Sequence, residues 1–155
     1  MPVQNGSQFP YPEFRKRHVR HHPSPIVWPW KSLAKELEAA EHTEYGTLTL
    51  AAPGGGHEIV PGTSMTFQAV RPGDRTTAHS HSWWHLYFAR SGAGTVMFDE
   101  TGESVELGEG DILLIPAWST HHFENPDGNE DLLLLNLSNL PQLAAIHNNF
   151  SEEHP

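Results

Sequence analysis

The sequence predicts an all-β fold, a single closed barrel or sandwich, from three observations. Short segments rich in β-branched and aromatic residues recur between residues 47 and 137, and turn signals separate them. The chain has 155 residues, enough for one domain and too few for a second barrel. His79 and His81 stand two apart on one of these segments, so their side chains would share one face of a strand. These observations predict one barrel with histidines turned toward its interior.

The N-terminal residues 1–25 are expected to form an irregular arm, because five prolines interrupt any helix. The arm contains a basic, histidine-rich run at residues 15–22. We interpret this run as a solvated segment that packs on a partner subunit, in preference to a separate metal site, because one short basic run has little specificity.

Residues 31–42 give the clearest helix signal, because Leu33, Leu37 and Ala40 share one helical face. This helix is expected to lie outside the barrel. A second short helix is expected at residues 142–146. The predicted domain therefore spans residues 26–147, and residues 148–155 are expected to fray. The predicted strands are residues 47–51, 64–70, 83–90, 94–99, 104–107, 111–115, 121–124 and 132–137.

Four histidines form the candidate metal site. His79 and His81 follow a turn at residues 71–74, and His85 keeps the same strand parity. His121 follows a second turn at residues 116–119, whereas His122 has the opposite parity and is expected to face away. Imidazoles gathered on one buried face would be costly to desolvate without a partner, so a metal ion is expected between them.

Two motifs with fixed offsets resemble the two motifs of the cupin superfamily. The first is Gly73, five residues, His79-Ser80-His81, three residues, His85, six residues, Gly92. The second is Gly110, five residues, Pro116, one residue, Trp118, two residues, His121, three residues, Asn125. The resemblance implies a double-stranded β-helix, or jelly-roll barrel, with the metal near its centre. His85 stands where glutamate is usual in this family, and Trp118 stands where glycine is usual.

A narrower resemblance, over about residues 26–147, is to the C-terminal half of gentisate and 1-hydroxy-2-naphthoate dioxygenases. The residues that carry it are Ile26-Val27-Trp28-Pro29-Trp30, Pro61, Gln68, Arg71-Pro72-Gly73 and Leu137-Ser138-Asn139-Leu140-Pro141. Those enzymes are iron(II)-dependent, ring-cleaving proteins of two cupin units, and their catalytic iron belongs to the N-terminal unit. By position, the resemblance implies a metal-ligand role for His79, His81 and His121.

The absence of cysteine leaves nitrogen and oxygen ligands for any ion. Iron(II) is the expected cofactor, with zinc, nickel or manganese as alternatives. His85 is predicted to be either a fourth ligand or an acid or base beside the ion. Three histidines would leave three positions of an octahedral ion open to substrate and dioxygen, whereas four would leave two and favour Lewis-acid chemistry.

Parity also predicts the residues around the metal. His85 and Tyr87 are the candidate catalytic groups, and Trp118 is expected to close the mouth of the barrel. Met65 and Phe67 are weaker candidates for the same inner face. The predicted substrate-binding residues are Trp83 and Phe123, from their parity, Gln68, which the family resemblance implies, and Trp118, at the barrel mouth.

The primary functional hypothesis is a mononuclear iron(II) dioxygenase that acts on a small hydroxylated aromatic or chelating organic acid. The alternatives are a non-oxidative metal-dependent lyase, isomerase or cyclase, and a small-molecule-binding barrel without turnover.

Residues 1–35 carry six basic residues and one acidic residue, whereas the remainder carries three basic and eighteen acidic residues. A barrel this acidic disfavours nucleic acid. We expect no membrane span, a cytoplasmic location, and a homodimer or higher homo-oligomer.

Overall fold

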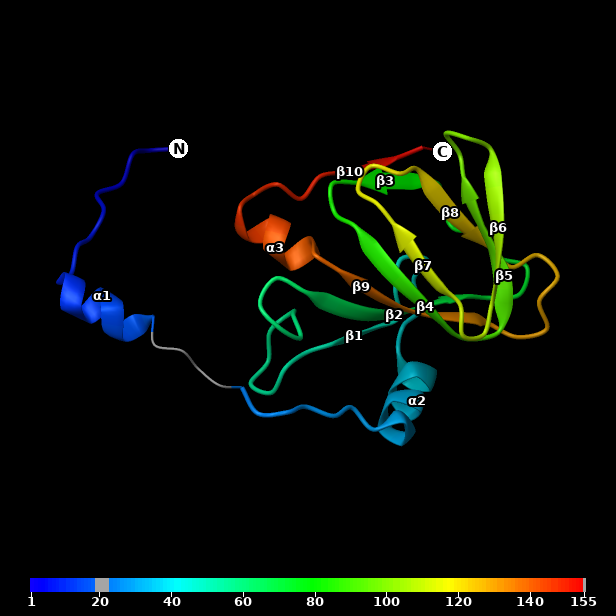
Figure 1. Ribbon diagram of the computed structural model, residues 1–155, viewed down its shortest axis with the longest axis horizontal. Coiled ribbons are helices and arrows are strands. Elements are labelled where there is room, and N and C mark those ends of the chain that lie inside the picture. The colour runs from blue at the N-terminus through cyan, green and yellow to red at the C-terminus, as the bar shows by residue number, and fades with distance from the viewer. Residues whose placement is uncertain (19–22, 155) are drawn as a thin grey trace.

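Two five-stranded antiparallel sheets form the body of the protein in the computed structural model, which describes residues 1–18 and 23–154 (Figure 1). The first sheet has the order β1-β2-β9-β4-β7 and the second the order β10-β3-β8-β5-β6. Strands distant in sequence are neighbours in both sheets, as in a jelly roll. The prediction of an all-β barrel is confirmed.

The predicted strands all appear, with small shifts at their ends. The first sheet consists of β1 (Leu48–Leu50), β2 (Ser64–Val70), β9 (Leu132–Ser138), β4 (His85–Ser91) and β7 (Ile112–Ile115). The second consists of β10 (Ser151–Glu153), β3 (His79–His81), β8 (His121–Glu124), β5 (Ala93–Phe98) and β6 (Glu103–Gly108). The helices are α1 (Tyr11–Arg17), α2 (Trp30–Ala39) and α3 (Leu140–Ala145).

The inner face of the first sheet changes from apolar to polar along its length. On β9, Leu132, Leu134, Asn136 and Ser138 are buried in strict alternation. The leucines join a core that contains residues of both sheets, including the fully buried Phe123. Because β2 and β4 flank β9 and pair with it through Asn136 and Ser138, their polar residues come level with these two side chains. One end of the barrel is therefore packed core, and the other can hold a polar site.

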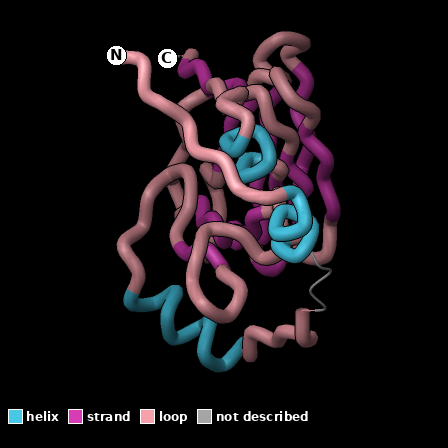
Figure 2. The backbone as a smooth tube through the Cα atoms, turned by 90° about the vertical axis from the view of Figure 1, so that its left-hand side faces the viewer, coloured by secondary structure: helices cyan, strands magenta, loops and turns pink. Residues whose placement is uncertain are grey.

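The outer face of the first sheet is covered by α2. Leu33 of this helix is buried against Leu50 and Phe67, and Met65 packs at the edge of the same cluster. Figure 2 shows α2 below the strands, outside the barrel. The prediction of an external helix is thus confirmed. The expectation that Met65 and Phe67 face the metal is wrong, because the register of β2 against β9 turns them toward α2 instead.

The N-terminal arm contains a helix where an irregular segment was predicted. Pro10 and Pro12 lie at the N-cap and in the first turn of α1, where a missing N–H costs no hydrogen bond. Glu13 and Arg17 form an ion pair of 2.7 Å one turn apart. The helix has no buried residue and stands clear of the barrel (Figure 1). Residues 19–22 of the basic run lie outside the described residues.

The C-terminal segment also differs from expectation. Residues 151–153 form β10, which pairs antiparallel with β3, whereas fraying was predicted. The pairing covers an edge that β3 would otherwise expose. Ser82 donates to the carbonyl oxygen of Asn148 at 2.7 Å, and the His154 N–H donates to that of Ala78 at 2.7 Å. The segment is therefore fixed to both ends of β3.

No helix in residues 1–18 and 23–154 combines the length and the apolar character needed to cross a membrane.

Candidate metal centre and cavity

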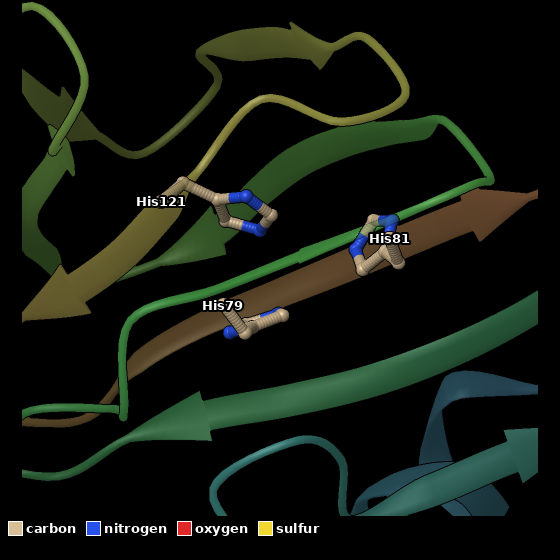
Figure 3. A group of neighbouring side chains, drawn as sticks. All are labelled: His79, His81 and His121. Atoms are coloured by element: carbon tan, nitrogen blue, oxygen red, sulfur yellow. The ribbon is translucent and has the colours of Figure 1, made fainter. Parts of the chain in front are cut away.

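Three histidines converge at the polar end of the barrel. His79 and His81 lie on β3, and His121 lies directly across from His79 on β8. Figure 3 shows the three rings around a common space. One nitrogen of each ring lies within 4.8 Å of the others. This is the convergence that the spacing of residues predicted.

Backbone carbonyls fix the orientation and tautomer of all three rings. The Nδ1 atoms of His79, His81 and His121 lie 2.9, 2.7 and 2.8 Å from the carbonyl oxygens of Thr77, Trp83 and Ser119. A carbonyl can only accept, so each Nδ1 carries the proton. Each Nε2 therefore presents a lone pair, as a metal ligand requires.

Two of these lone pairs are buried without a partner. His81 is 2% exposed and His121 is fully buried, and neither Nε2 atom has a hydrogen bond. Such groups are costly to leave unpaired. Neutral imidazoles without thiolate suit iron, zinc, copper or nickel. The residues therefore fit a mononuclear metal centre, in which His79, His81 and His121 would be the ligands.

Burial favours the neutral form of His81, His121 and His85. It lowers the pKa of His81 to about 4, an effect that the charge of nearby His79 reinforces. Burial likewise lowers the pKa of His121 to about 4, with His79 and His81 adding to the shift. The pKa of His85 also falls well below its usual value, first because of burial and then because of His81 and His121. His81 and His121 are therefore neutral at neutral pH, the form that a metal ligand requires.

His85 lies beside the ligands but makes different contacts. Its ring centroid is 4.7 Å from that of His81. The indole N–H of Trp83 donates to its Nε2 at 3.1 Å, and its Nδ1 lies 3.1 Å from the Oδ1 of Asn136. Both ring nitrogens are therefore engaged. Ligation by His85, which the sequence left open, would require the Trp83 contact to break.

A cavity of about 310 Å³ opens beside the histidines. Its size is at the small end of ligand pockets, about 300–1,000 Å³. One wall is formed by Tyr87 and by neutral polar side chains of the first sheet. The lining residues are Tyr45, Ser64, Thr66, Gln68, His79, His81, Trp83, His85, Tyr87, Asn136, Ser138, Leu140, Ser151, Glu152 and Glu153.

Three predicted pocket residues line this cavity. Trp83 is stacked on His81 with ring centroids 4.2 Å apart. Gln68 donates from Nε2 to the carbonyl oxygen of Glu44 at 2.8 Å. Burial raises the pKa of Tyr87, so its phenol stays protonated.

The other two predicted pocket residues lie elsewhere. Phe123 is fully buried in the core behind His121, with ring centroids 6.0 Å apart. Trp118 is 46% exposed and is not among the cavity residues. Its φ angle is 65°, which explains why glycine is usual at this position of the motif. Its N–H donates to the carbonyl oxygen of His81 at 2.7 Å, so Trp118 supports β3 through its backbone.

Several lining residues of the cavity were not predicted from the sequence. Asn136 and Ser138 continue the alternation of Leu132 and Leu134, so the period of β9 could have revealed them. Tyr45 and Glu153 have no such signal, because their positions depend on tertiary contacts. The hydroxyl of Tyr45 donates to Oε1 of Glu153 at 3.0 Å. Burial, this hydrogen bond and the charges of Glu44 and Glu153 raise the pKa of Tyr45 to about 12.

His122 faces away from the metal centre, as its parity predicted. Its Nδ1 lies 2.9 Å from Asp99 and its Nε2 lies 3.0 Å from Glu124. Both nitrogens are therefore occupied on the other side of β8.

Residues 66–138 match the cupin domain family, in agreement with the jelly-roll fold. Among curated proteins, the chain is 26% identical over 132 residues to the 5-aminosalicylate 1,2-dioxygenase of a Comamonas species, covering 80% of this chain and 34% of the relative. It is 27% identical over 127 residues to the 1-hydroxy-2-naphthoate 1,2-dioxygenase of a Nocardioides species, covering 79% and 32%.

Among solved structures, the salicylate 1,2-dioxygenase of Pseudaminobacter salicylatoxidans superposes with a TM-score of 0.74 at 18% identity. The superposition covers 89% of this chain and 42% of that one. At this identity the likeness shows the fold. The predicted resemblance to ring-cleaving dioxygenases is confirmed, and the chain spans about a third of the length of the two curated relatives.

Proposed function

We propose that this protein is a mononuclear iron(II) dioxygenase that acts on a small hydroxylated aromatic compound. The observation that carries the proposal is the set of three Nε2 lone pairs on His79, His81 and His121, two of them buried without a partner. The relatives named above are called 1,2-dioxygenases, which supports the same reaction class. Iron(II), when bound, would supply the electron transfer between substrate and dioxygen.

The residues of the cavity have separate tasks in this proposal. The three ligand histidines hold the ion, and their carbonyl partners keep the rings in place. Trp83 and Tyr87 shape the space for one aromatic ring and exclude water. His85 is proposed as the group that accepts a substrate proton at Nε2, the nitrogen that now accepts from Trp83.

Oxygen uptake tests the proposal directly. Protein purified under nitrogen and loaded with iron(II) is expected to consume dioxygen when hydroxylated benzoates, catechols or aminophenols are added. Rates should rise with iron content up to about one ion per chain. Product formed without oxygen consumption would indicate the non-oxidative alternatives, and ligand binding without any turnover would indicate a binding protein.

We also propose that two copies associate through the arm. Phe9, Tyr11 and Phe14 are exposed on and beside α1, and the arm is basic whereas the barrel is acidic. The edge strand β7 exposes Ile112 and Leu114, which offer an apolar surface to an arm from a second copy. A cytoplasmic location stays a prediction.

Light scattering after size exclusion tests the association. The full chain is expected to elute as a dimer or larger assembly. Replacing Phe9, Tyr11 and Phe14 together with serine should give a monomer, and added salt should weaken the wild-type assembly because opposite charges are screened. A triple serine replacement that leaves the mass unchanged would show that the arm is not the contact.

A further inference from the structure

The cavity beside the three histidines has an acidic rim. Glu152 and Glu153 of β10 line it, together with Tyr45. Glu153 pairs with His79 across the two strands, so its carboxylate lies on the strand next to a metal ligand. The hydroxyl of Tyr45 holds that carboxylate at 3.0 Å, and the Tyr45 ring meets the His79 ring edge-on at 5.2 Å. The negative charge is therefore fixed at the mouth of the site.

Within residues 1–18 and 23–154, no lysine or arginine lines this cavity to balance that charge. The three arginines of the barrel have other positions. Arg75 pairs with Glu124 at 3.5 Å, and Arg90 stacks on Trp30 at 4.5 Å. Arg71 lines a different hollow beside α2. A substrate carboxylate turned toward β10 would thus meet acidic groups and no cation.

The remaining wall is polar but neutral. Ser64 and Ser138 share a hydrogen bond of 2.9 Å, and Asn136 contacts His85. These groups can donate to or accept from a hydroxyl or an amine but cannot neutralise a carboxylate. The two buried, unpartnered Nε2 atoms of His81 and His121 mark the place where the ligand's chelating atoms belong.

We infer that the cavity binds a hydroxylated aromatic amine or a neutral phenol more tightly than a phenol whose free carboxylate points at β10. Glu153 is the residue that discriminates between these ligands. The inference rests on the proposed function, since it needs a metal at the histidines to hold the chelating hydroxyls. The inference narrows the class of hydroxylated aromatic substrates to those whose substituent far from the chelating hydroxyls is cationic or uncharged.

Binding of three matched catechols to the iron(II)-loaded full chain under nitrogen tests this inference. The probes carry an aminomethyl, a methyl or a carboxylate group para to one hydroxyl, and quenching of tryptophan fluorescence reports binding because Trp83 lines the cavity. The wild-type protein is expected to bind the amine about tenfold more tightly than the carboxylate. Glu153→Gln should reduce that ratio to about two or three, since each exposed charge pair contributes roughly three- to fivefold and Glu152 remains.

Glu109→Gln is the matched control. Glu109 lies in the exposed turn between β6 and β7, so its substitution removes one negative charge away from the cavity. It should leave the ratio unchanged. Equal affinities for the three catechols, or a ratio that Glu153→Gln does not alter, would overturn the inference while the metal centre stands. Failure of the wild-type chain to retain iron would overturn the proposed function as well, so metal content is measured on every sample.

Discussion

Replacing His121 with glutamine is expected to lower the affinity of the protein for iron(II) by more than about 100-fold. The Nε2 atom of His121 is one of three converging donors, and it is fully buried. Removing a residue that only hydrogen-bonds to a metal ligand typically lowers metal affinity 10- to 100-fold, so removing the ligand itself is expected to lower it further. Elemental analysis after dialysis against a graded chelator series, under nitrogen, measures the change.

His85→Gln is the informative comparison. Both nitrogens of His85 are engaged by Trp83 and Asn136, so this variant should retain iron within about tenfold of the wild type. His57→Gln, in an exposed loop, controls for the loss of one histidine from the chain. A His85 variant as deficient as His121→Gln would show that four histidines hold the ion and that the Trp83 contact opens on metal binding.

The metal-free protein is expected to lose stability as the pH falls from about 6.5 toward 4. Burial lowers the folded-state pKa of His81 and His121 to about 4, against 6.5 for an ordinary histidine. Between these values the unfolded chain binds more protons than the folded one, so the free energy of unfolding decreases with decreasing pH. The two groups together should remove on the order of 3 kcal/mol between pH 7.5 and pH 5.

Urea unfolding followed by tryptophan fluorescence, in the presence of a chelator, measures this loss at each pH. The double variant His81→Gln, His121→Gln lacks both groups, so its stability should vary much less over the same range. If the wild-type and double-variant curves run parallel, the buried histidines are not the source of the acid sensitivity.

Local sequence signals predicted most of the sheet and the metal centre. Strand parity placed His79 and His81 on one face, because it depends only on neighbours in sequence. The resemblance of the two fixed-offset motifs to a known family then joined His121 to them. Which residues of neighbouring strands share a face of the sheet could not be predicted from the sequence. The inner face of β2 was therefore assigned without evidence, and Met65 and Phe67 were placed on the wrong side. Gln68, which the family resemblance implied, lines the cavity.

Other misses have different physical causes. Pro10 and Pro12 were taken as helix breakers, although prolines before and within a first turn are compatible with a helix. The strand β10 carries no apolar alternation, since all three of its residues are exposed, and it forms because β3 offers an unpaired edge. Glu153 reaches the cavity only through that pairing, and Tyr45 reaches it from the segment before β1, so no local pattern could identify either residue.

The pairing of His79 with His121, and of His79 with Glu153, has a kinetic consequence. The residues that meet at this point come from three distant parts of the chain, so the binding geometry exists only after the long-range strand pairs have closed. Partly folded chains would bind metal weakly, through isolated imidazoles. Metal binding, measured after rapid mixing of refolding protein with a divalent ion, would then report when these strand pairs have formed.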